Sequence, residues 1–100
     1  MKLVYRPQFW LDLEAGVAYL KDKASVELAI QWHEEVMASV GRVQKQPDLG
    51  RVRHDLRPAG VRSFVIKRYP RYLLFYVWQR DAIEVLRIKH CMMDLARLFP

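Results

Sequence analysis

Four side chains suited to phosphate or acid–base chemistry lie in the second half of the chain: Arg62, Arg87, Lys89 and His90. Guanidinium and ammonium groups stabilise negative charge on a phosphate, and an imidazole moves protons near neutral pH. Arg62 and Arg87 lie inside strand-like runs, where a guanidinium is costly to bury unless an anion pairs with it. The pattern fits either an anion site or a structural ion pair of Arg87 with a carboxylate close in sequence, Glu84 or Asp94.

Other catalytic or metal-binding patterns are missing from the sequence. His33, His54, His90 and Cys91 do not have the spacing of a known metal site, and His33 is interpreted as a surface or boundary residue. There is no glycine-rich phosphate loop and no G-x-S-x-G turn. We therefore expect no metal and no cofactor, and neither nucleotide hydrolysis nor esterase activity.

The composition indicates one domain that spans residues 1–100. The chain has 52% hydrophobic and 12% aromatic residues, which is enough for a packed core. Its single cysteine, Cys91, has no partner within the chain, and residues 1–6 lack the apolar segment of an export signal. The longest uncharged apolar run, residues 72–79, is far shorter than the roughly 18 residues of a membrane helix. We expect a cytoplasmic protein without a membrane contact.

The positive charge is concentrated in the second half of the chain. Residues 1–50 contain six Lys/Arg and seven Asp/Glu, whereas residues 51–100 contain eleven and four. The net charge of +6 therefore comes from the second half. Such a surface attracts an acidic protein or a nucleic acid, although it also serves simply to keep a protein soluble.

The first half predicts an antiparallel pair of amphipathic helices. Pro7 suits the first turn of a helix that runs to about Lys21, and Ser25 is a suitable N-cap for a second helix that runs to about Gln46. Asp12 lies largely off the apolar stripe of the first helix. The two stripes consist of Phe9, Leu13, Val17 and Leu20, and of Ala29, Trp32, Val36, Val40 and Val43.

The second half predicts strands. Residues 61–67, 72–78 and 82–89 read as strands, with a connection at 69–71, and residues 3–5 and 52–56 read as short edge strands. The run 72–78 is apolar on both faces, so we expect it at the centre of the sheet. One face of the sheet is then exposed or closed by a helical turn over 93–98. The predicted fold is α+β, an N-terminal antiparallel helical hairpin packed on a small antiparallel β-sheet.

Three features of the stretch 60–95 stand in a characteristic order: Gly60-x-Arg62, the aromatic run from Tyr69 to Trp78, and Ile83 to His90 followed by Asp94-Leu95. With these features the stretch resembles the C-terminal sheet of the RelE/ParE superfamily of small bacterial toxins. The resemblance implies a RelE/ParE-like fold and the toxin of a type II toxin–antitoxin system, a class associated with plasmid stabilization.

The ParE branch is favoured by the pattern F-Y-V … I-E-V-L-R-I-x-H-x-x-x-D-L. This branch implies inhibition of DNA gyrase, which the toxin traps on cleaved DNA without catalytic groups of its own. The chain departs from the usual H-G-x-R-D ending, because Cys91 stands at the glycine position and Met93 at the arginine position. A member that binds its antitoxin but has lost toxicity is therefore an alternative.

The RelE branch implies a second alternative, a ribosome-dependent mRNA endonuclease. Arg62 and Arg87 would then stabilise charge on the scissile phosphate, and His90 would move protons. Ribonuclease members usually place an acid–base residue near the C-terminus, whereas this chain has no tyrosine after Tyr76.

Both branches imply a cognate antitoxin, ParD-like in the favoured case, whose acidic C-terminal segment folds as it binds and forms a hetero-oligomer with the toxin. Arg51, Arg53 and Arg57 are expected to lie in an exposed charged segment. Two further aromatic residues, Phe9 and Trp32, are possible anchors. The candidate partner-binding residues are Trp10, Arg51, Arg53, Arg57, Arg62, Tyr72, Trp78 and Arg87.

Overall fold

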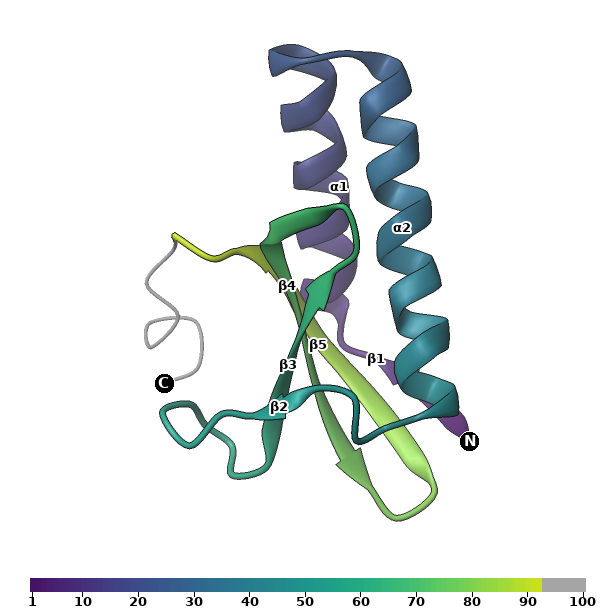
Figure 1. The fold of residues 1–100 in the computed structure, drawn as a ribbon, viewed down its shortest axis with the longest axis vertical. Coiled ribbons are helices and arrows are strands. Elements are labelled where there is room, and N and C mark those ends of the chain that lie inside the picture. Colours follow the sequence, from purple (N-terminus) through teal and green to yellow (C-terminus); the bar gives the residue numbers. More distant parts are fainter. Residues whose placement is uncertain (93–100) are drawn as a thin grey trace.

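A computed structural model describes residues 1–92 of the chain. Its helices form an antiparallel pair that packs on one face of a β-sheet, and the end of the pair that contains the loop between them extends beyond the sheet (Figure 1). This arrangement confirms the predicted α+β fold. The elements are β1 (Lys2–Tyr5), α1 (Pro7–Lys23), α2 (Val26–Lys45), β2 (Arg51–Val52), β3 (Val61–Ile66), β4 (Tyr69–Gln79) and β5 (Ala82–His90).

The sheet is mixed, whereas the sequence predicted an antiparallel one, because β1 pairs with β5 in parallel. Its strand order is β1-β5-β4-β3-β2 in the described part of the chain. Strands β2 to β5 form an antiparallel meander, whereas β1 pairs with β5 in parallel, with Lys2 opposite Ala82 and Tyr5 opposite Val85. The helical pair carries the chain from β1 to the far edge, and the meander returns to β1 running in the same direction.

The helix boundaries agree with the sequence prediction to within about two residues. The Ser25 hydroxyl accepts a hydrogen bond from the Leu28 N–H at 3.0 Å, which confirms Ser25 as the N-cap of α2. No helix in residues 1–92 is long and apolar enough to span a bilayer.

Two strand boundaries were predicted incorrectly. Strand β4 begins at Tyr69, so residues 69–71 belong to a strand, and β3 and β4 are joined by the two-residue turn Lys67–Arg68. Strand β2 ends at Val52, because the chain then leaves the sheet as a loop over residues 53–60. The helical turn predicted over residues 93–98 lies outside the described residues.

The main core lies between the helices and the sheet. Its buried residues come from both helices and from β3, β4 and β5: Phe9, Leu13, Trp32, Val36, Val40, Val43, Ile66, Leu74, Tyr76, Ile83, Val85 and Ile88. Tyr76 also ties β4 to the loop between α2 and β2, since its hydroxyl donates to the Pro47 carbonyl at 2.7 Å and accepts from the Gly50 N–H at 2.8 Å. Burial raises the pKa of Tyr76.

A second, smaller cluster covers the opposite face of the sheet. It contains Leu56, Val61, Phe75, Val77 and Leu86, with Leu73 packed against it. The strand β4 is therefore apolar on both faces, as its sequence predicted. The sequence had suggested only residues 93–98 as a cover for this face, but Leu56 from the loop over 53–60 is part of that cluster.

The two helical glycines are expected to respond to alanine in opposite directions. A Cβ on Gly16 would overlap the ring of Trp32, which is buried between the helices, so Gly16→Ala should destabilise the fold by about 1–3 kcal/mol. A Cβ on Gly41 meets no atom, so Gly41→Ala should stabilise the fold by about 0.5–1 kcal/mol. Urea unfolding of both variants measures the two changes. Equal effects at both positions would contradict the close packing at Gly16.

Candidate functional site

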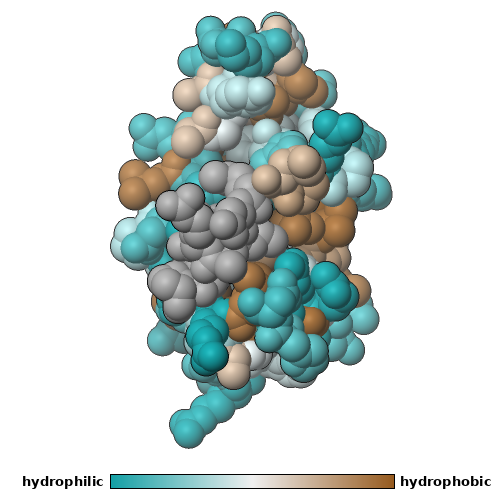
Figure 2. Space-filling model, turned by 90° about the vertical axis from the view of Figure 1, so that its left-hand side faces the viewer, coloured by the Kyte–Doolittle hydropathy of each residue, from teal (hydrophilic) through white to brown (hydrophobic). Residues whose placement is uncertain are grey.

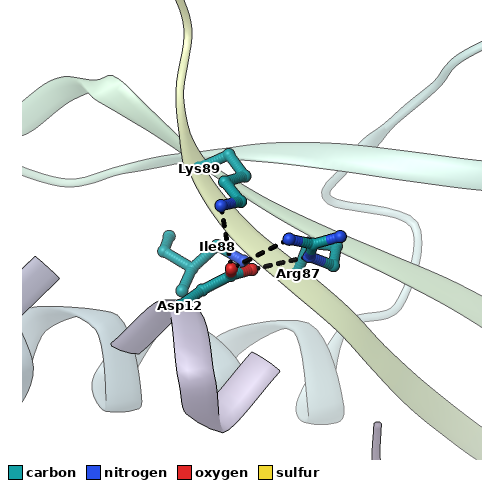
Figure 3. A network of polar contacts seen from close by, with 4 residues as sticks. All are labelled: Asp12, Arg87, Ile88 and Lys89. Carbon is teal, nitrogen blue, oxygen red and sulfur yellow. Dashed lines mark hydrogen bonds and ion pairs between the residues drawn. The ribbon is translucent and has the colours of Figure 1, made fainter. Parts of the chain in front are cut away.

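The carboxylate of Asp12 on α1 binds Arg87 and Lys89, two of the four side chains that the sequence analysis selected for phosphate or acid–base chemistry (Figure 3). Arg87 binds it through two hydrogen bonds, from Nε at 2.7 Å and from Nη2 at 3.0 Å. The Lys89 ammonium lies 2.9 Å from Oδ1, and the backbone N–H of Ile88 donates to Oδ2 at 3.2 Å. The hydrogen bonds to Asp12 raise the pKa of Arg87. The Asp12 side chain is 5% exposed, so this is a nearly buried ion pair network.

The network forms where β5 runs beyond the end of β1. The last paired residues are Tyr5 and Val85, and the edge of β5 beyond Val85 lies against α1. There Asp12 takes the place of a neighbouring strand by accepting the Ile88 N–H. Two expectations are thereby corrected, because Asp12 is buried and Arg87 pairs with it across 75 positions. Glu84 instead lies 3.3 Å from Arg6, and Asp94 is outside the described residues.

Arg62 has a separate structural role. Its Nη1 donates to the Gly50 carbonyl at 2.7 Å, and its guanidinium lies 5.7 Å from the centre of the Trp78 ring. In the sheet Arg62 is opposite Tyr76, which faces the helices. Its charge therefore stabilises the loop before β2 and an aromatic ring.

The structure does not bring Arg62, Arg87 and His90 together. Arg87 is opposite Phe75, whose side chain belongs to the cluster on the far face of the sheet, whereas Arg62 is on the helix side. A β-bulge in the β4–β5 pair, between Phe75 and Tyr76, shifts the register, so the side chains of β5 do not alternate regularly between the two faces of the sheet at this point. His90 is opposite Tyr72, roughly 13 Å along β4 from the row of Arg62. A catalytic site that uses these three residues at once is not formed.

A cleft lies beside His90, between α1 and the ends of β4 and β5. Its volume is about 760 Å³, and the side chains that decide its chemistry are Tyr19, Tyr69, Arg71, Tyr72, Lys89 and His90. The His90 ring packs edge-on against Tyr72, and its Nδ1 accepts a hydrogen bond from the Met92 N–H at 3.1 Å. Desolvation by burial raises the pKa of Tyr72.

The candidate partner-binding residues are dispersed and differ in exposure. Trp10 and Trp78 are 44% and 41% exposed, and Arg51 and Arg57 are exposed as well. Tyr72 is only partly buried and contacts the core. The face of the molecule that Figure 2 shows is mostly hydrophilic and contains several hydrophobic patches.

Three other expected contact residues are not available on the surface. The Arg53 side chain is 10% exposed and is bound by Asp55 through two hydrogen bonds of 2.9 and 2.7 Å, so the expectation that Arg53 is exposed was wrong. Phe9 and Trp32 are fully enclosed in the core and cannot serve as surface anchors. Within residues 1–92, no three side chains form a group that could hold a metal ion.

Nearly the whole sequence matches the model of a protein family. The matching family model describes the ParE toxin of type II toxin-antitoxin system, parDE, and it covers residues 3–95. The chain belongs to this ParE toxin family. No curated protein matches it in sequence.

Solved structures share the fold of this ParE family member at low sequence identity. The chromosomal ParDE TA system from P. aeruginosa matches with a TM-score of 0.75 and 21% identity over 90% of this chain and 95% of the other. The YoeB/ParE toxin from Agrobacterium tumefaciens matches with a TM-score of 0.59 and 20% identity, over 90% of this chain and 98% of the other. A conserved hypothetical protein from Helicobacter pylori matches with a TM-score of 0.52 and 19% identity, over 90% of this chain and 93% of the other.

Removing the Asp12 carboxylate from the ParE family member is expected to be costly. Asp12→Ala leaves Arg87 and Lys89 without an anion at sites where each side chain is 19% exposed, so it should destabilise the fold by about 3 kcal/mol. Glu14→Ala, an exposed position on the same helix, is the control and should change stability by less than about 0.5 kcal/mol. Denaturant unfolding provides the measurement. Equal stability of the two variants would show that the network contributes nothing.

The Arg53–Asp55 pair predicts a pH dependence at the loop. The hydrogen bond from Arg53 lowers the pKa of Asp55 from 3.8 to about 2. Because the folded-state pKa is depressed, the stabilising contribution is complete above pH 3.8 and is lost as the pH falls from 3.8 towards 2. Carboxyl NMR titration should show Arg53→Gln shifting the Asp55 midpoint back towards 3.8, while Arg57→Gln leaves it unchanged. A midpoint near 3.8 in the parent protein would contradict this interaction.

Proposed function

We propose that this ParE family member is a cytoplasmic toxin that inhibits DNA gyrase and is neutralised by a cognate antitoxin in a hetero-oligomer. The observation that carries the proposal is the family match over residues 3–95, which includes both the helical hairpin and the sheet. A gyrase inhibitor acts by binding, so it requires no catalytic group of its own.

The geometry of the cationic residues supports binding over catalysis. Arg87 and Lys89 are bound by Asp12, and Arg62 is bound by the Gly50 carbonyl. These three cations therefore stabilise the fold in the free protein. Catalysis by charge stabilisation needs donors that are arranged around the reacting atoms in advance, and these three lie on different faces and rows of the sheet.

The charge and exposed side chains of the surface also support the proposal that an acidic antitoxin segment binds the protein. The chain has a net charge of +6, which comes from its second half, and Arg51 and Arg57 in that half are exposed. Exposed apolar side chains such as Trp10, Leu11 and Trp78 are suited to burial by a partner that folds as it binds. The P. aeruginosa structure named above is of a chromosomal ParDE TA system, which supports the same type of partner.

A ribosome-dependent mRNA endonuclease is the second candidate, because one feature favours it. His90, Tyr72 and two cationic residues, Arg71 and Lys89, line the same cleft. An imidazole near cations is the arrangement that general acid–base cleavage of RNA requires. An antitoxin-binding member without toxicity is the remaining alternative.

Two assays on the purified chain distinguish these functions. With gyrase, ATP and relaxed plasmid, we expect less supercoiling and an accumulation of cleaved DNA, and cells that express the chain should form filaments with a DNA-damage response. With ribosomes programmed with mRNA, we expect no cleavage.

Ribosome-dependent cleavage of mRNA by the parent protein would contradict the gyrase assignment, provided that the cleavage rate falls by a factor on the order of 10² to 10³ in the His90→Gln variant. Normal gyrase activity together with intact mRNA would instead indicate the non-toxic alternative.

A further inference from the structure

The β3–β4 hairpin concentrates positive charge at its tip. From residue 56 to residue 80 the sequence contains six Lys/Arg and no Asp or Glu. Lys67, Arg68 and Arg71 lie at or next to the turn and are exposed. Within residues 1–92 none of these three side chains forms an ion pair, in contrast to Arg53, Arg87 and Lys89. The tip is therefore available to an anionic ligand.

The backbone conformation at the second position of the turn, Arg68, is unfavourable for a residue with a side chain. Arg68 has a φ of 72°, in the left-handed region that glycine and asparagine normally occupy in two-residue hairpin turns. An arginine there is less favourable than glycine by about 1 kcal/mol. A residue at positive φ whose side chain has no ion pair or hydrogen bond within residues 1–92 is a reason to look for a function of that side chain.

The aromatic cleft beside His90 begins at this tip. Tyr69, Pro70 and Arg71 at the start of β4 line one side, and Tyr19 of α1, which is 57% exposed, lines the other. Among the described residues, Asp12 is the carboxylate in the lining, and its two oxygens already accept from Arg87, Lys89 and Ile88. The cleft thus combines tyrosine rings with uncompensated positive charge.

We propose that the tip and the cleft form a binding site for single-stranded nucleic acid. Lys67, Arg68 and Arg71 contact successive phosphates, and a base enters the cleft against the tyrosine rings. An acidic peptide would satisfy the cations equally well, but the three tyrosines in one cleft favour a ligand with planar rings. This site goes beyond the proposed function, because gyrase is not needed for it.

The experiment is a fluorescence anisotropy titration of a labelled oligothymidylate of about 12 nucleotides with the full chain. Three phosphate contacts on a single strand predict a slope of about −2 for log K against log salt concentration. Gyrase is absent from this assay, so its outcome is independent of the gyrase proposal.

The chain offers a matched pair of variants. Arg68 and Arg80 are both arginines at positive φ in two-residue strand turns, with φ values of 72° and 54°, but Arg80 lies at the other end of β4. Glycine suits both positions, so Arg68→Gly and Arg80→Gly should both keep the fold and its melting temperature. We expect Arg68→Gly to weaken binding several-fold and to reduce the salt slope to about −1.4, while Arg80→Gly has little effect.

Tyr19→Ala tests the base contact separately, because it removes an exposed ring without removing charge. It should weaken binding by about fivefold or more while the salt slope is unchanged. The proposal is overturned if the oligonucleotide does not bind, or if Arg68→Gly and Arg80→Gly bind it alike. It is also overturned if a polyglutamate peptide of the same charge binds as tightly, since the tip would then be a site for an acidic protein.

Discussion

The contact between Asp12 and the edge of β5 determines how the helical hairpin sits on the sheet. One carboxylate accepts from Arg87, Lys89 and the Ile88 backbone, and it does so at the place where β1 no longer covers β5. This contact fixes the position of α1. The position of α2 follows, because Gly16 lets the Trp32 ring lie directly against α1. The cleft between α1 and the sheet is a consequence of the same contact.

Local patterns made most of the secondary structure predictable. Apolar periodicity, the cap at Ser25 and the doubly apolar β4 are properties of neighbouring residues, and each was found in the structure. The parallel pairing of β1 with β5 was not predictable, because it depends on residues about 80 positions apart. The partner of Arg87 was missed for the same reason. Asp12 could have been noticed, since it lies three residues after Phe9 and four before Gly16, both on the helix face that packs inward.

The positive charge of the chain separates into two groups with different roles. Arg53, Arg62, Arg87 and Lys89 are engaged within the protein, and they include most of the residues that the sequence nominated for chemistry. At the hairpin tip, Lys67 and Arg68 belong to no sequence motif, and only the fold places the tip beside an aromatic cleft. Cationic residues inside strands are conspicuous in the sequence because they are unusual there, and such residues are often the ones that a fold has paired internally.

The pairing of the first strand with the last strand also affects how the protein forms during synthesis. Residues 2–5 pair with residues 82–85, and Asp12 binds residues 87–89. Until that segment has emerged from the ribosome, β1 has no neighbour and the strands of the meander lack their final member. A chain built in this way has a high contact order, which slows folding and prolongs the exposure of apolar strands. The parallel pair thus delays the completed sheet until residues 82–85 are available, and a partner that recognises the folded form can act only from that moment.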